Sequence, residues 1–301
     1  MASISLPETI PEWMQAAGRQ RVRNQSLWQN VKLHSASQVT YKQYLLFRTI
    51  VPSIISPEDL NVQHFGIAPR IAQANQVLSD LAFVDYLTNV TDRDTQPYGL
   101  WGGNDRLFRI PAIQQQEVIQ GEVVGGGSAD QSEATVNTAC ISFLQAIADL
   151  IPQSTRQWTA CRIKLEADFS TQRRERRFVA YTDGHLKDIS NGQTLALIEC
   201  KKSRREKHSP AVDMQEVAQM VALVKQHPLG PNRRVLVAQD GAELYVSVFE
   251  YDQGWLRYLN GGSGSIAHAG FAYMRRYGPW NIRRASDMEH FALIITALLH
   301  L

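Results

Sequence analysis

The chain has 301 residues, which is enough for one large domain or two modest ones. Apolar residues make up 44% of it and charged residues 20%, a balance that excludes a disordered chain and favours a folded globular protein. The formal net charge of +2 is too small to indicate a binding partner by itself.

Neither a membrane segment nor a signal peptide is evident in the sequence. No run of about 18 apolar residues occurs, and the first residues lack the basic start and apolar middle of a secretory signal. We therefore expect no membrane association and an intracellular location, nuclear or cytoplasmic. The cysteines, Cys140, Cys161 and Cys200, lack zinc-site or disulfide spacing, so we expect them to be small residues in a reducing compartment.

Residues 1–120 predict a mainly helical N-terminal region without a catalytic signature. The segment 56–59 (SPED) has the cap, proline and acidic residues of a helix start, and apolar residues from Ile71 to Val84 follow helical spacing. Residues 98–105 predict a loop and residues 106–113 a short strand. The role of this N-terminal region stays open.

Glycine and serine dominate residues 125–128 and 261–265, which indicates either natural flexible loops or engineered linkers.

The order of elements after Ser132 predicts a compact α/β unit over residues 131–301. Helical periodicity covers residues 133–151 and ends at Pro152, and a proline-started helix covers residues 209–227. A last apolar helix runs from Asp287 to the end of the chain. The predicted strands cover residues 157–169, 178–181, 195–200, 234–239 and 244–251, with an arginine-rich turn at residues 170–177.

Two acidic residues and a lysine follow predicted strands in a pattern that suits metal-dependent chemistry. Asp183 comes after one strand, and Glu199 and Lys201 lie at the end of the buried apolar strand. Alternation along a strand points Glu199 and Lys201 to the same face. Carboxylate oxygens are ligands for Mg²⁺ or Mn²⁺, and a nearby ammonium suits the charge that develops in phosphodiester hydrolysis. We expect these three side chains to converge at one edge of the sheet.

The segments TDG (182–184), LIECK (197–201) and MQEVAQM (214–220) resemble the PD-(D/E)XK phosphodiesterase superfamily, particularly nuclease-like proteins common in fungi. The resemblance covers residues 133–300. It implies a restriction-endonuclease-like core with a central mixed sheet flanked by helices, and a nuclease that uses Mg²⁺ or Mn²⁺. Thr182 stands where the family has the proline of its name, a residue without metal contact.

The resemblance also implies a role for individual residues. Asp183 matches the first acidic metal ligand and Glu199 the second, and the backbone carbonyl of Cys200 matches a third. Lys201 matches the lysine that orients the water or stabilises the transition state. Glu133 matches an additional acid at the start of the preceding helix.

A further match lies on the helix after the motif strand. Gln215 resembles the glutamine of RecB-like exonucleases. The tyrosine that this subfamily has four residues later is absent, because Gln219 stands there. The resemblance to that particular subfamily is therefore incomplete.

A basic segment surrounds the motif. From Arg162 to Lys207 there are twelve lysines and arginines against seven acidic residues, a local charge of +5. These residues predict either a nucleic-acid surface or an ordinary solvated face. The candidate phosphate contacts flank the motif on both sides and are Arg173, Arg174, Arg176, Arg177, Lys202, Arg204 and Arg205.

The sequence thus favours a metal-dependent nuclease that acts on DNA or RNA. The alternative is a catalytically inactive nuclease-fold protein that serves as a nucleic-acid-binding or protein-interaction scaffold. An enzyme for small phosphate esters is less favoured, since no phosphate-binding loop of the Walker type occurs. DNA against RNA, endonuclease against exonuclease, and the oligomeric state stay open.

Overall fold

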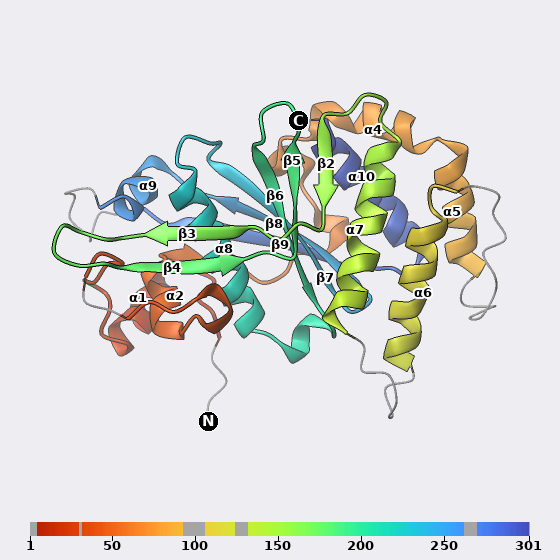
Figure 1. Ribbon diagram of the computed structural model, residues 1–301. Coiled ribbons are helices and arrows are strands. Elements are labelled where there is room, and N and C mark those ends of the chain that lie inside the picture. Colours follow the sequence, from red (N-terminus) through yellow and green to blue (C-terminus); the bar gives the residue numbers. More distant parts are fainter. Residues whose placement is uncertain (1–4, 30–31, 93–105, 124–131, 262–269, 301) are drawn as a thin grey trace.

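The computed structural model describes residues 5–29, 32–92, 106–123, 132–261 and 270–300 (Figure 1). Its centre is a seven-stranded mixed sheet with helices on both faces, in the strand order β1-β9-β8-β7-β6-β5-β2. The expectation of an α/β protein with a central mixed sheet flanked by helices is therefore confirmed. The strands of this sheet are β1 (Thr49–Ile50), β2 (Arg156–Thr159), β5 (Gly184–Asp188), β6 (Thr194–Lys201), β7 (Arg233–Asp240), β8 (Glu243–Glu250) and β9 (Ala272–Asn281).

The pairing of β6 places the ends of two strands together. β6 is antiparallel to β5 and parallel to β7, and helix α8 (Ala211–Gln226) makes the crossover between β6 and β7. Leu197, Ile198 and Cys200 are fully buried, as expected for a strand covered on both faces. Because β6 and β7 are parallel, Lys201 and Asp240 lie opposite each other at the same sheet edge.

The two faces of the sheet carry separate hydrophobic cores. One core joins Ile198, Cys200 and Val237 to the helices α4 (Ile71–Leu78), α5 (Leu81–Asp92), α6 (Arg109–Val123), α7 (Glu133–Asp149) and α10 (Ala285–Leu299). The other joins Leu197 and Leu236 to α1 (Ile10–Arg19), α2 (Tyr41–Leu46), α8 and α9 (Gln253–Leu259). The remaining short helices are α3 (Val62–Phe65), η1 (Ala36–Gln38), η2 (Pro57–Asp59), η3 (Ala68–Arg70) and η4 (Arg205–Lys207).

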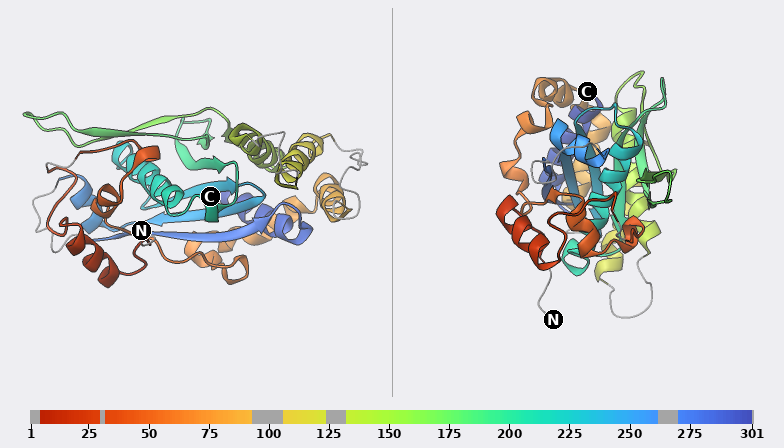
Figure 2. Two further views of the ribbon diagram at one scale, coloured as in Figure 1. Left: turned by 90° about the horizontal axis from the view of Figure 1, so that it is seen from below. Right: turned by 90° about the vertical axis from the view of Figure 1, so that its left-hand side faces the viewer.

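A two-stranded arm, β3 (Lys164–Asp168) and β4 (Arg177–Tyr181), lies outside the main sheet. It runs across the face that α8 covers, and its tip points away from the sheet centre (Figures 1 and 2). Residues from the N-terminal region also join this structure, since β1 pairs in parallel with β9. The division of the chain at residues 120–131 stays a prediction.

The structure corrects two predicted strands. Residues 106–113 do not form a strand; they enter helix α6, whose buried Ala112 and Val118 continue the helical spacing from Phe108. Residues 157–169 form two strands, β2 and β3, in different sheets. Trp158 and Leu165 are both buried although seven residues apart, and a single strand would place them on opposite faces. That change of parity marks the break.

The predicted helix start at residues 56–59 forms only a single turn, η2, and the helical spacing over residues 71–84 is divided between α4 and α5. Helices α7, α8 and α10 confirm the other expected helices. Strands β1, β5 and β9 had no counterpart in the predicted set. No helix in the described ranges is long and apolar enough to cross a membrane. The predicted loop at residues 98–105 and the glycine-serine stretches, apart from Gly261, lie outside the described residues.

Candidate metal and catalytic site

Asp183 and Glu199 meet where β6 runs past the start of β5. The backbone N–H of Asp183 donates to the carbonyl of Ile198 at 3.0 Å, and the N–H of Cys200 donates to Asp183 Oδ2 at 2.9 Å. Lys201 Nζ lies 2.5 Å from Glu199 Oε1, so the strand alternation does place these two side chains on one face. The structure brings Asp183, Glu199 and Lys201 together at one sheet edge.

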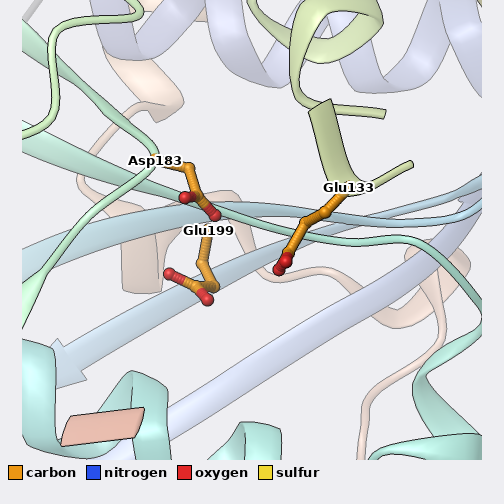
Figure 3. A group of neighbouring side chains, drawn as sticks. All are labelled: Glu133, Asp183 and Glu199. Carbon is orange, nitrogen blue, oxygen red and sulfur yellow. The ribbon is translucent and has the colours of Figure 1, made fainter. Parts of the chain in front are cut away.

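Glu133 reaches the same place from helix α7. Ser132 caps this helix by accepting the N–H of Thr135 at 3.1 Å, which fixes Glu133 in the first turn. Glu133 Oε1 then accepts a hydrogen bond from Lys201 Nζ at 2.9 Å. Figure 3 shows its carboxylate beside those of Asp183 and Glu199. One oxygen of each carboxylate lies within 4.8 Å of the others. We call Glu133, Asp183 and Glu199 with Lys201 the carboxylate cluster.

Two glutamines of helix α8 hold the buried carboxylate of Glu199. Gln215 Nε2 donates to Glu199 Oε1 and Gln219 Nε2 to Glu199 Oε2, both at 2.5 Å. Gln219 Nε2 also lies 2.9 Å from the carbonyl oxygen of Tyr181. Gln215 and Gln219 are four residues apart and share one helix face. From the sequence, Gln219 was noted only as the residue in place of a tyrosine. Its four-residue spacing from Gln215 nevertheless predicts that both side chains lie on the same face of the helix.

Burial sets the charge state of the cluster. Burial raises the pKa of Glu199 to about 8, even though the Lys201 ammonium lowers it. Burial also raises the pKa of Asp183, against the hydrogen bond from the Cys200 N–H. Burial alone would lower the pKa of Lys201, but the charges of Glu199 and Glu133 and their hydrogen bonds to the ammonium together outweigh burial and raise that pKa. The Lys201 ammonium is therefore the cation that interacts with all three carboxyl groups of the cluster.

The donor set of the cluster fits a hard divalent cation. Its three carboxylates offer the oxygen ligands that Mg²⁺ and Mn²⁺ prefer. The Cys200 N–H faces Asp183, and the N–H and C=O groups of one strand residue project from the same strand edge. The Cys200 carbonyl therefore faces the side on which Asp183 lies. The residues present would suit an ion held by Asp183, Glu199, Glu133 and this carbonyl.

The prediction that Arg205 contacts a phosphate is wrong, because this side chain is buried. It is 2% exposed, and its Nε donates to Asp240 Oδ2 at 2.7 Å. Its Nη1 donates to Asp213 Oδ1 and to Glu216 Oε2, both at 3.0 Å. Arg276 Nη1 also donates to Asp213 Oδ1, at 2.6 Å. We call Arg205 and Arg276 with Asp213, Glu216 and Asp240 the arginine cluster.

The other candidate phosphate contacts differ in their surroundings. Arg176 is buried, which also removes it from the accessible set. Arg177 is exposed but pairs with Glu166 and Glu175. The exposed candidates are Arg173 and Arg174 in the turn of the arm, and Lys202 and Arg204 just after β6.

Searches for similar proteins returned neither a matching family model nor a matching curated protein. The carboxylate cluster and the surfaces next to it are therefore the features that bear on function.

Proposed function

We propose that this protein is a nuclease that uses Mg²⁺ or Mn²⁺ to hydrolyse phosphodiester bonds, on a restriction-endonuclease-like core. The observation that carries the proposal is the convergence of three carboxylates and one lysine at the shared edge of β5 and β6. Asp183, Glu199, Glu133 and the Cys200 carbonyl would hold the ion. The strand-borne Asp183 and Glu199-x-Lys201 pattern, which resembles the PD-(D/E)XK superfamily, supports the same assignment.

When bound, the ion supplies Lewis-acid activation of phosphate and water. The protein's own residues supply the arrangement. The Cys200 N–H fixes Asp183, and Gln215 and Gln219 fix both oxygens of Glu199, so neither carboxylate can turn away from the cluster.

Lys201 supplies the positive charge of the proposed mechanism. Glu133 and Glu199 hold its ammonium at 2.9 Å and 2.5 Å, and its raised pKa keeps it protonated. A fixed cation at this place stabilises negative charge that develops on a phosphate in the transition state.

The test is single-turnover cleavage of single- and double-stranded DNA and RNA in Mg²⁺ or Mn²⁺. Asp183→Asn should abolish cleavage and leave the fold intact, because it removes one of several mutually repelling carboxylates. Lys201→Ala should lower the rate by roughly two to three decades, as expected for one lost transition-state donor, and should still bind Mn²⁺ in calorimetry.

Matched controls lie at the other end of β5. Asp188→Asn and Lys187→Ala change the same residue types outside the cluster and should retain the wild-type rate. Thermal melting checks that every variant is folded. If the wild-type protein neither cuts these substrates nor binds Mn²⁺, the scaffold alternative replaces the nuclease proposal.

A further inference from the structure

The β3–β4 arm connects the carboxylate cluster to a distant exposed turn. β4 ends at Tyr181, two residues before Asp183, and the opposite end of the arm is the turn closed by the bridge between Thr171 and Arg174. We call residues 171–174 the arm tip. The arm carries the tip outward along the molecule, away from the edge where β5 and β6 meet (Figures 1 and 2).

The arm is braced by the N-terminal region and by α8. Its inner face is apolar and buried, and Phe178 packs against Phe47 with ring centroids 5.5 Å apart. Phe169 packs edge to face against Trp28, also at 5.5 Å. An isolated two-stranded hairpin is marginally stable in water, so these contacts hold the arm in place. Support of the arm is therefore a structural role of the N-terminal region that its sequence did not predict.

Uncompensated positive charge on the arm is concentrated at its tip. On the outer face, Glu166 pairs with both Lys164 and Arg177, at 3.3 Å and 3.2 Å. Arg173 and Arg174 are exposed and form no ion pair with any residue that the structure describes. At the root, the exposed Arg162 places Nη2 3.8 Å from Asp183 Oδ1. Positive groups therefore stand at both ends of an electrically balanced arm.

The distance from the arm tip to the carboxylate cluster can be compared with the spacing of phosphates along a nucleic acid. Arg174 precedes Asp183 by nine residues, which span about 30 Å in extended chain at ~3.3 Å per residue. Phosphates on one duplex strand follow each other at about 3.4 Å along the axis, so the arm matches about nine nucleotides. A duplex is stiff over this distance, whereas a single strand would have to be ordered to span two fixed points.

We infer that the arm tip binds the backbone of a nucleic-acid duplex about nine base pairs from the phosphate at the carboxylate cluster. This inference rests on the proposed function and adds the substrate's form and minimum length. Lys202 and Arg204 lie directly after β6, so the footprint is long on the arm side of the site and short on the other.

The experiment measures fluorescence anisotropy of labelled duplexes of about 6, 12 and 18 base pairs, with proteins that carry Asp183→Asn to prevent cutting. Affinity should rise steeply between the shortest and the middle length. Arg173→Glu with Arg174→Glu should remove this rise, leave binding of the shortest duplex unchanged, and reduce the slope of log K against log[salt] on the longest by about 1.8. The matched control is Arg70→Glu with Arg109→Glu, two exposed arginines on η3 and α6.

Two outcomes overturn the inference while the nuclease proposal stands. One is cleavage by the wild-type protein together with equal effects of the tip and control substitutions; the other is tighter binding of single strands than of duplexes of equal length. If the wild-type protein neither binds nor cuts any probe, both proposals fail together.

Discussion

The carboxylate cluster and the arginine cluster lie beside each other at the ends of β6 and β7, yet they differ in how charge is compensated. In the arginine cluster two guanidinium groups face three carboxylates, and every member is buried. In the carboxylate cluster three carboxylates share one ammonium, and Glu133 is exposed to solvent. Buried ions are tolerated where they are paired, and each carboxylate of the first cluster accepts a hydrogen bond from a guanidinium, so we call this arrangement closed. The second has one ammonium for three carboxyl groups, and this shortage of positive partners favours a cation.

Helix α8 connects the two clusters. It contributes Asp213 and Glu216 to the arginine cluster, and Gln215 and Gln219 to Glu199. Arg205 ties this helix to β7 through Asp240. The arginine cluster therefore positions the amides that hold Glu199, although it touches none of the carboxylate ligands in the hydrogen bonds above.

The largest effect on stability is expected from breaking the arginine cluster. Arg205→Met removes a guanidinium that satisfies three buried carboxylates, so the free energy of unfolding should fall by about 3–5 kcal/mol. Urea denaturation measures this loss. Arg204→Met is the neighbouring control, since Arg204 is half exposed and its nearest carboxylates lie at 3.8 Å and 4.0 Å. Equal stability of the two variants would contradict the closed character of the arginine cluster.

The carboxylate cluster was easier to predict than the arginine cluster, because its main contacts are local. Asp183, Glu199 and Lys201 lie within nineteen positions on one hairpin, and strand alternation alone orients Glu199 and Lys201 together. Arg205 meets partners on α8 and β7, and no periodicity in its own basic segment links it to them. It therefore resembled a surface residue.

The predicted strand over residues 157–169 failed for a related reason. Its apolar residues looked continuous, but the parity of burial changes between Trp158 and Leu165, and that change separates a strand of the main sheet from the arm. Strand β5 was missed because Asp183-Gly184 has turn composition, although Gly184 is already paired with Ile198.

An intermediate effect is expected where α8 meets the carboxylate cluster. Gln219→Leu removes the amide that holds Glu199 Oε2, so the affinity for Mn²⁺ should fall about 10- to 100-fold, as for other lost supports of a metal ligand. Isothermal titration calorimetry measures the affinity. Gln145→Leu is the control, because Gln145 donates to the carbonyl of Trp158 outside the cluster. Unchanged Mn²⁺ affinity in Gln219→Leu would mean that Glu199 does not depend on this amide, or is not a ligand.

A pH dependence of thermal stability is expected in the metal-free protein. Burial raises the pKa of Glu199 from 4.5 to about 8 and that of Asp240 from 3.8 to about 7, so the folded state retains protons that the unfolded state releases. The stability linked to Glu199 is thus fully present below its unfolded pKa and is lost as the pH rises toward about 8.

Melting temperatures measured in chelator from about pH 5 to about pH 9 should therefore decline, and Glu199→Gln should flatten the upper part of this decline. Asp240→Asn should flatten a lower part, because the pKa of Asp240 is raised to about 7. With Mn²⁺ present the trend should reverse in the wild-type protein, since an ion binds the deprotonated carboxylates and its affinity rises with pH. Glu199→Gln should lose that reversal and Asp240→Asn should keep it, because Asp240 belongs to the closed arginine cluster and Glu199 to the cluster that would hold the ion. A reversal that survives Glu199→Gln would remove Glu199 from the metal site.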